Sequence, residues 1–217
     1  MTFKTKLFSH VFVKSQRPSQ NLIVVLHGRG DSYEGFSWLP AALQLDDVNY
    51  LMVNAPDPYY GGFSWYDLPP DQLPGIKRSS ALLDRLFAEL EEQGYRAADS
   101  VLFGFSQGCL MALEWGARSS LCLRGFVALS GYCYNEIKLA DEFSATALQT
   151  KWLITHGTRD EVLPYKDTEK QIRYLQSKGF PAEFHSFPKS HTIDEVKELP
   201  LIRKWLRTVF DTPRQLP

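Results

Sequence analysis

The pentapeptide Gly104-Phe105-Ser106-Gln107-Gly108 constrains the fold of this chain more than any other segment. It follows the apolar run 101–103 and precedes a second apolar run, 109–113, that is typical of a helix. In this context Gly-x-Ser-x-Gly predicts a nucleophile elbow, a sharp strand-to-helix turn that exposes a serine oxygen above a sheet. Side chains two positions either side of the serine would collide with the neighbouring strand and helix, which explains the glycines.

Length and charge favour one domain and exclude some partners. The chain has 217 residues, enough for one α/β domain with a sizeable core, and contains no linker-like stretch. We therefore expect a single domain over 1–217. The 24 Lys and Arg residues nearly balance the 25 Asp and Glu residues, for a formal net charge of -1. This balance predicts no nucleic-acid partner and no attraction to an anionic membrane, and the substrate need not be highly charged.

The cysteines and the N-terminal segment predict a cytoplasmic protein. Three cysteines, Cys109, Cys122 and Cys133, cannot all pair with one another and lie in apolar stretches, so we expect reduced, packed thiols. Residues 1–14 lack the continuous apolar core of a signal peptide, and no apolar span reaches about 20 residues. We expect a cytoplasmic location and no stable membrane insertion.

Short apolar runs rich in β-branched residues alternate with segments of helical period. The middle runs are apolar on both faces, which is typical of a parallel sheet covered by helices on each side. Alternation of this kind predicts an α/β fold with a doubly wound, mostly parallel sheet and right-handed crossovers. The expected strands are 7–13, 22–27, 50–54, 100–103, 125–129, 152–155 and 182–187.

Three segments carry a helical stripe. Leucine and phenylalanine recur at helical spacing over 82–90, before Gly94, and a weaker pattern over 166–178 ends at Gly179. The third stripe spans 201–210. Asp194 can cap the N-terminus of this last segment, while Pro200 either kinks it or opens a second helix at its first turn.

A serine hydroxyl is a poor nucleophile at neutral pH, so Ser106 needs a base and a group that orients the base. His191 is the candidate base, because it lies in a loop after the last expected strand. In chains with such an elbow the order along the sequence is serine, acid and then histidine. Asp160 is the candidate acid, since it follows the strand 152–155 and lies between the other two in sequence. The remaining histidines lie within or at the ends of expected strands: His10, His27, His156 and His185.

Acyl transfer also requires N–H donors where the carbonyl oxygen becomes negative. The backbone N–H of Gln107, the residue after the serine, is one expected donor of an oxyanion hole. The second is expected in the glycine turn 27–31, at the N–H of Arg29. The side chains of His27 and Asp31 are expected only to brace this turn.

Together, the segments 27–31, 104–108, 156–160 with Leu163-Pro164, and Ser190-His191 resemble the carboxylesterase/lysophospholipase/acyl-protein thioesterase family of small α/β-hydrolases. The resemblance covers nearly the whole chain. It implies an α/β-hydrolase fold with no large cap domain, a catalytic triad, two backbone oxyanion donors, no cofactor, and ester or thioester substrates. Dimers are common in such families, so it also implies a homodimer. The triad would be Ser106, Asp160 and His191, with the donors at Arg29 and Gln107.

The chain departs from the family pattern at several positions. Cys109 stands where a further glycine is usual, Arg29 replaces a small apolar residue, Tyr33 replaces a glycine, and Ser190 replaces the more usual residue before the histidine. A backbone donor survives a change of side chain, so these differences do not threaten the hydrolytic groups. The guanidinium of Arg29 would, however, alter the entrance or favour an acidic group on the substrate.

Specificity is expected in the long segment 57–70, which is dense in aromatic residues. Residues 64–67, Ser-Trp-Tyr-Asp, resemble a family segment that borders the acyl or alcohol pocket. The aromatic side chains either clamp an apolar chain or pack the loop onto the domain, and packing near the site is the preferred interpretation for Trp65. The candidate substrate-binding residues are Tyr60, Phe63, Trp65 and Tyr66.

These patterns predict a serine carboxylesterase for short- to medium-chain acyl esters. An acyl-protein thioesterase or a lysophospholipase would use the same three side chains, and a non-catalytic binding protein on this fold is the alternative from another class. No metal-binding motif is present, so we expect no metal. A nicotinamide cofactor is not expected either, because Gly28 and Gly30 lack the third glycine of a dinucleotide fingerprint.

Overall fold

A seven-stranded, mostly parallel sheet forms the centre of the molecule, in the order β1-β3-β2-β6-β7-β8-β9. The computed structural model describes residues 3–212. β1 runs antiparallel to β3, and each of the other neighbouring pairs is parallel. The strands are β1 (His10–Val13), β2 (Leu22–Leu26), β3 (Asn49–Val53), β6 (Ser100–Phe105), β7 (Gly125–Leu129), β8 (Trp152–Gly157) and β9 (Ala182–Phe187).

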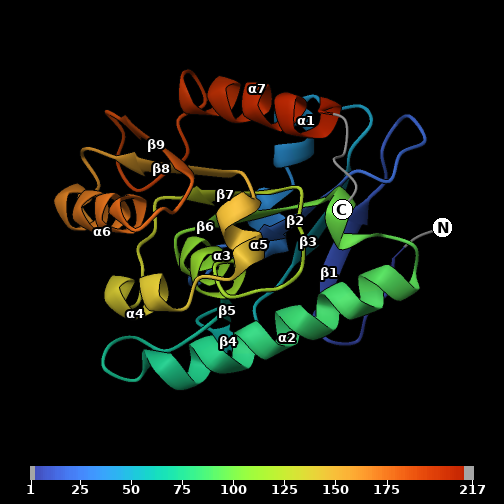
Figure 1. Cartoon of the computed structure of the whole chain (residues 1–217). Coiled ribbons are helices and arrows are strands. Elements are labelled where there is room, and N and C mark those ends of the chain that lie inside the picture. The colour runs from blue at the N-terminus through green and yellow to red at the C-terminus, as the bar shows by residue number, and fades with distance from the viewer. Residues whose placement is uncertain (1–2, 213–217) are drawn as a thin grey trace.

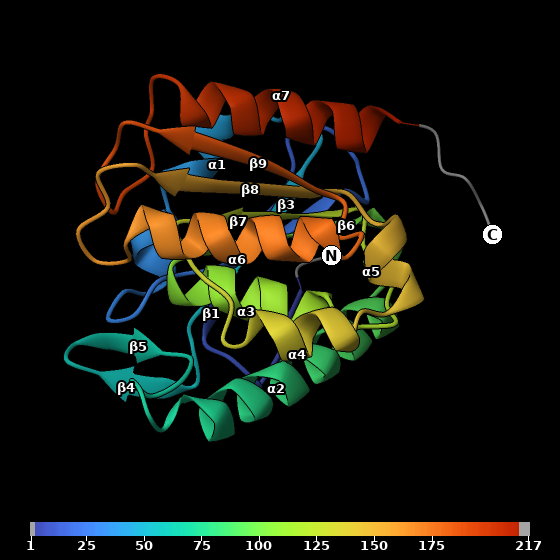
Figure 2. The same cartoon turned by 60° about the vertical axis from the view of Figure 1, so that its left-hand side comes forward.

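Helices cover both faces of the sheet (Figures 1 and 2). One face carries α1 (Leu39–Leu43) and α7 (Glu198–Asp211), shown at the top of Figure 1. The other carries α2 (Gln72–Glu92), α3 (Gln107–Gly116), α4 (Glu136–Asp141), α5 (Ala145–Gln149) and α6 (Tyr165–Ser177). Short 3-10 helices occupy Tyr33–Phe36 and Ala97–Asp99.

The alternation of side chains along the strands divides the apolar core into two layers. In β2, Leu22, Val24 and Leu26 pack with α2 and α3 on one face, whereas Ile23 and Val25 pack with α1 and α7 on the other. All five residues are buried. This two-sided burial explains why the sequence is apolar at consecutive positions, and it confirms the predicted α/β-hydrolase fold with a mostly parallel sheet.

The structure corrects several expected element bounds. The N-terminal strand begins at His10 instead of residue 7, because only His10 to Val13 pair with β3 at the edge of the sheet. The segment 57–70 is not a simple loop, since β4 (Asp57–Tyr59) and β5 (Gly62–Ser64) form an antiparallel hairpin. Figure 2 shows this hairpin outside the main sheet.

The last helix begins within a capped turn. Asp194 Oδ1 accepts hydrogen bonds from the N–H groups of Val196 and Lys197 at 2.9 and 2.7 Å. It therefore caps the turn before α7, and α7 itself begins at Glu198 with no side-chain cap. Pro200 lies in the first turn of α7, where its missing N–H costs no helical hydrogen bond, so it opens this helix and does not kink it.

The three thiols are free, but they are not all packed. Cys109 and Cys133 are buried, and burial raises the pKa of the Cys109 thiol to about 12. Cys122 is exposed, which corrects the expectation that it would be packed: it lies in the irregular segment between α3 and β7. No helix within residues 3–212 is long and apolar enough to cross a membrane.

Candidate active site

Ser106 lies at a strained turn between β6 and α3. Its φ and ψ are 54° and -112°, a left-handed backbone conformation that is uncommon for a residue other than glycine. A Cβ at Gly104 would lie 2.1 Å from the carbonyl oxygen of Gly108, and one at Gly108 would lie 2.2 Å from that of Leu26. The two glycines thus allow α3 to approach β6 and β2 closely enough to present the serine at the sheet edge.

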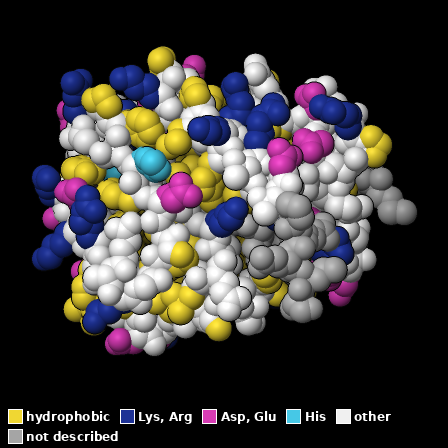
Figure 3. Space-filling view, turned by 45° about the horizontal axis from the view of Figure 1, so that its top comes forward, with side chains coloured by type: hydrophobic (Ala, Val, Ile, Leu, Met, Phe, Trp, Pro, Cys, Tyr) yellow, Lys and Arg dark blue, Asp and Glu magenta, His cyan; other side chains and the backbone are white. Residues whose placement is uncertain are grey.

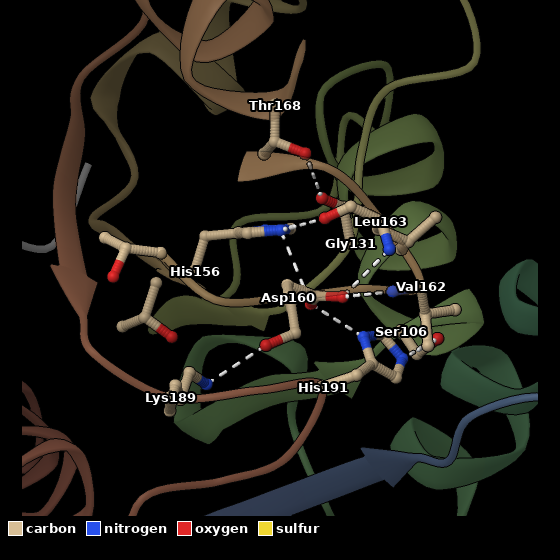
Figure 4. Close-up of polar contacts among 12 residues, drawn as sticks. Ser106, Gly131, His156, Asp160, Val162, Leu163, Thr168, Lys189 and His191 are labelled. Carbon is tan, nitrogen blue, oxygen red and sulfur yellow. Dashed lines mark hydrogen bonds and ion pairs between the residues drawn. The ribbon is translucent and has the colours of Figure 1, made fainter. Parts of the chain in front are cut away.

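His191 connects Ser106 to Asp160 through two hydrogen bonds (Figure 4). His191 Nε2 lies 2.9 Å from Ser106 Oγ, and His191 Nδ1 lies 2.8 Å from Asp160 Oδ2. The serine follows β6, the aspartate follows β8 and the histidine follows β9, so the three loops meet at the carboxyl edge of the sheet. With the proton on Nδ1 donated to Asp160, Nε2 is free to accept the proton of the serine hydroxyl.

Asp160 is held by its own loop. Its Oδ1 accepts hydrogen bonds from the N–H groups of Val162 and Leu163 at 3.0 and 2.8 Å. Burial alone would raise the pKa of Asp160, but the hydrogen bonds from Leu163, His191 and Val162 lower it below the usual value. The carboxylate therefore stays ionised at neutral pH while both of its oxygens have fixed partners.

His156 lies on the other side of this carboxylate. Its Nε2 lies 2.9 Å from the carbonyl oxygen of Leu163 and 3.5 Å from Asp160 Oδ2. Burial lowers the pKa of His156, so the ring is neutral at pH 7 and carries its proton on Nε2. The buried imidazole thus holds the loop that contains Asp160 and Leu163 without adding a charge.

The glycine turn after β2 lies directly against the serine. A Cβ at Gly28 would lie 3.3 Å from Ser106 Cβ, a tight contact that glycine avoids. His27 Nδ1 lies 2.6 Å from the carbonyl oxygen of Gly28, and His27 Nε2 accepts the N–H of Ala55 at 2.9 Å. These contacts define the neutral tautomer, in agreement with the burial that lowers the pKa of His27. His27 therefore braces the turn, as expected.

The turn also pairs with the hairpin. Gly30 N–H donates to Phe63 O at 2.8 Å, and Phe63 N–H donates to Asp31 O at 2.9 Å. No hydrogen bond among residues 3–212 uses the backbone N–H of Arg29 or of Gln107. Among the described residues, both candidate oxyanion donors therefore have no acceptor.

The side chain of Gln107 has a structural task that the sequence did not reveal. Its Oε1 accepts hydrogen bonds from Trp65 N–H at 2.9 Å and Ser64 Oγ at 3.2 Å, and its Nε2 donates to Tyr66 O at 2.8 Å. The amide is buried. The same residue thus offers its backbone N–H beside Ser106 and holds the segment that follows β5.

The four candidate aromatic residues occupy different environments. Trp65 and Tyr66 are almost completely buried, and Trp65 Nε1 donates to His27 O at 2.9 Å, so Trp65 packs beneath the site. Phe63 is half-buried, with its ring centroid 6.4 Å from that of His27. Tyr60 is 93% exposed at the hairpin turn.

A buried ion pair supports the His191 loop, and sequence reasoning missed it. Lys189 Nζ lies 2.6 Å from Glu198 Oε1 and also donates to Ser130 Oγ and Thr192 O at 3.0 and 2.7 Å. Glu198 accepts further hydrogen bonds from Thr155 Oγ1 and from Asp194 N–H. The sequence offered two signals of this ion pair: Lys189 lies two residues before the candidate histidine, and Glu198 lies in the helix that follows.

A cavity of about 270 Å³ opens beside the histidine. Part of its wall is apolar, and Phe105 packs against the imidazole with ring centroids 5.1 Å apart. Two carboxylates add negative charge. Its lining includes Asp31, Phe36, Phe105, His191, Ile193 and Glu195.

A Ser-His-Asp arrangement at the carboxyl edge of such a sheet defines an α/β-hydrolase with a serine nucleophile. The family model for phospholipases and carboxylesterases matches residues 9–210. Acyl-protein thioesterase 1 of Kluyveromyces lactis is 31% identical over 207 residues, which cover 84% of this chain and 90% of that protein.

Solved structures of an esterase and of a thioesterase have the same fold. Esterase PE8 has a TM-score of 0.81 and 29% identity over 93% of this chain and 99% of that one. Acyl-protein thioesterase 2 of Zea mays has a TM-score of 0.79 and 25% identity over 94% of this chain and 99% of that one. The chain belongs to the phospholipase/carboxylesterase family, and it is a serine hydrolase that acts on carboxylic esters.

Proposed function

We propose that the protein is a carboxylesterase that cleaves short- to medium-chain acyl esters through an acyl-enzyme on Ser106. The observation that carries the proposal is the continuous hydrogen-bonded chain from Ser106 through His191 to Asp160. An imidazole between a hydroxyl and a buried carboxylate is arranged for general-base catalysis.

This geometry supports the following reaction. His191 Nε2 takes the Ser106 proton as Oγ attacks the ester carbonyl, and the backbone N–H groups of Arg29 and Gln107 donate to the resulting oxyanion. Collapse breaks the bond to the alcohol, which leaves with the proton from His191. Water then loses a proton to His191 as it attacks the acyl-enzyme, and collapse releases the carboxylic acid while His191 returns this proton to Ser106 Oγ.

The hairpin supplies the proposed substrate wall. Phe63 borders the turn that carries Arg29, and Tyr60 extends from the tip of the hairpin. Trp65 and Tyr66 shape the wall from beneath, because their side chains are buried and their backbone is held by Gln107.

Substitution of Ser106 by alanine tests the mechanism. Ser106→Ala removes the attacking oxygen and should abolish turnover of p-nitrophenyl butyrate, and a fluorophosphonate probe should label the wild-type protein but not the variant. A wild-type protein that neither turns over esters nor reacts with the probe would instead support a non-catalytic binding protein.

A second candidate activity is thioester or lysophospholipid hydrolysis. The acyl-protein thioesterases of Kluyveromyces lactis and Debaryomyces hansenii among the relatives favour it, and the same three side chains would perform it. A series of p-nitrophenyl esters from acetyl to palmitoyl separates the two: a maximum at short or medium chains supports the carboxylesterase, and a steep maximum at long chains supports the alternative.

The homodimer and the cytoplasmic location are also proposals. The family resemblance supports the dimer, and light scattering coupled to gel filtration would measure its mass. Free cysteines at positions 109, 122 and 133 fit a reducing compartment. Cell fractionation with an antibody would test the location.

A further inference from the structure

Arg29 projects a guanidinium that the described part of the protein leaves without an acidic partner. Its Cζ lies 4.1 Å from the centroid of the Tyr59 ring, a cation–π contact that holds the group on the β4–β5 hairpin. No Asp or Glu within residues 3–212 makes an ion pair with it, and its Nε is buried without a hydrogen-bond partner. The contact with the Tyr59 ring leaves the terminal N–H groups at the edge of the guanidinium able to donate hydrogen bonds. No residue within 3–212 accepts a hydrogen bond from them.

The backbone of Arg29 lies between a residue that contacts Ser106 and a residue that pairs with the hairpin. Gly28, the residue before Arg29, lies against Ser106, where a Cβ would come within 3.3 Å of the serine Cβ. Gly30, the residue after it, is hydrogen-bonded to Phe63 on β5 at 2.8 Å. Arg29 therefore connects the serine to the hairpin, and its side chain extends to the hairpin.

The position of His191 indicates where the alcohol part and the acyl part of an ester substrate lie. The leaving alcohol must receive a proton from His191, so it occupies the cavity that this imidazole lines. That cavity is not lined by Arg29 or by a residue of the hairpin, and it carries the carboxylates of Asp31 and Glu195, which repel an anion. The acyl group therefore extends towards Arg29 and Tyr59.

We propose that Arg29 binds a carboxylate at the far end of the acyl group, so that the preferred substrates are half-esters of dicarboxylic acids. This inference rests on the proposed esterase function and adds the substrate class. A guanidinium presents parallel N–H groups that match a carboxylate, whereas a neutral acyl chain gains nothing from it.

The test compares two acyl groups of the same shape and different charge. p-Nitrophenyl hydrogen adipate ends in a carboxylate, and p-nitrophenyl adipamate carries an uncharged amide in its place. The wild-type protein should show a kcat/KM about 10- to 100-fold higher for the charged ester, since a charged hydrogen bond contributes more than a neutral one. This preference should decrease as ionic strength rises.

Variants assign the preference to one side chain. Arg29→Leu should reduce the ratio of kcat/KM for the charged ester to kcat/KM for the amide to about one, and because both esters are measured on the same protein, any effect on the oxyanion donor cancels in this ratio. Arg29→Lys should retain an intermediate ratio, since the charge stays but the planar fork is lost. Arg85→Leu, at an exposed site on α2, removes the same charge and should leave the ratio unchanged.

Three results would overturn the proposal: equal kcat/KM for the two esters in the wild type, an unchanged ratio in Arg29→Leu, or a similar ratio loss in Arg85→Leu. The wild-type comparison decides the matter even if a variant does not fold. Loss of all turnover in the wild type would instead contradict the proposed esterase function, so the two failures are distinguishable.

Discussion

Lys189 Nζ lies 2.6 Å from Glu198 Oε1, and both side chains are almost completely buried beneath the loop that carries His191. Lys189 precedes the histidine by two residues, and its ammonium also binds the carbonyl oxygen of Thr192 just after it. Burial lowers the pKa of Lys189, and the nearby Glu198 opposes this shift. The pair therefore fixes the loop on both sides of the imidazole.

Removing one member of this pair should destabilise the protein strongly. Lys189→Met leaves the Glu198 carboxylate buried without its cation, which costs about 3 to 5 kcal/mol in the free energy of unfolding. Urea denaturation measures the loss. Lys166→Met is the matched control, because Lys166 is 84% exposed in its ion pair with Glu169 and should cost less than about 1 kcal/mol. Similar losses in the two variants would contradict this account.

Asp160→Asn should impair catalysis with little effect on KM. The asparagine oxygen can still accept the N–H groups of Val162 and Leu163, but its amide then faces His191 Nδ1 and favours the wrong imidazole tautomer. We expect kcat for p-nitrophenyl butyrate to fall about 10,000-fold, as in other serine triads. Asp167→Asn, at an exposed position in the first turn of α6, is the control. Retention of more than a tenth of the wild-type kcat in Asp160→Asn would exclude the orienting role.

Gln107→Leu should affect both stability and substrate binding. The substitution removes the acceptor of Trp65 N–H and the donor to Tyr66 O, and leaves these buried backbone groups unpaired, at about 1 to 3 kcal/mol each. Thermal unfolding should show the loss, and KM for neutral esters should rise because the segment that follows β5 is held less firmly. Gln107→Glu keeps the acceptor but loses the donor, so an intermediate stability is expected. Wild-type stability in Gln107→Leu would contradict this role.

The buried histidines should make the protein less stable in mild acid. Burial lowers the pKa of His27 and of His156 below the usual value of 6.5. Below pH 6.5 the unfolded chain therefore binds protons that the folded chain does not bind, and the free energy of unfolding falls as pH decreases towards the folded pKa values. Urea denaturation from pH 8 to pH 5 measures this slope. His156→Gln should reduce the slope, because it removes one of the two buried imidazoles. A slope unchanged by His156→Gln would contradict the assignment.

The sequence predicted those parts of the molecule that depend on local patterns. The strands, the elbow at Ser106 and the order of serine, acid and histidine each follow from a run of apolar residues, a glycine pattern or a position after a strand. Because parallel strands place their carboxyl ends at one edge, the loops containing Asp160 and His191 meet there.

Other parts depend on contacts between distant segments. The short helices α1, α4 and α5 and the β4–β5 hairpin carry weak local signals and are stabilised by the packing around them. The pairing of Lys189 with Glu198 requires a loop and a helix to fold together, and no periodic pattern reports it. The amide of Gln107 reaches a segment 42 residues away at Trp65, which the motif around the serine cannot reveal.

The side chain of Gln107 holds the C-terminal end of the β4–β5 hairpin, at Ser64, and the two residues that follow it. The amide bonds main-chain atoms of Trp65 and Tyr66 and the hydroxyl of Ser64. These hydrogen bonds do not depend on which residues form the tip of the hairpin. Substitutions between Tyr59 and Gly61 therefore leave these hydrogen bonds in place, and under the proposed role of the hairpin as the acyl wall they change which acids the enzyme accepts.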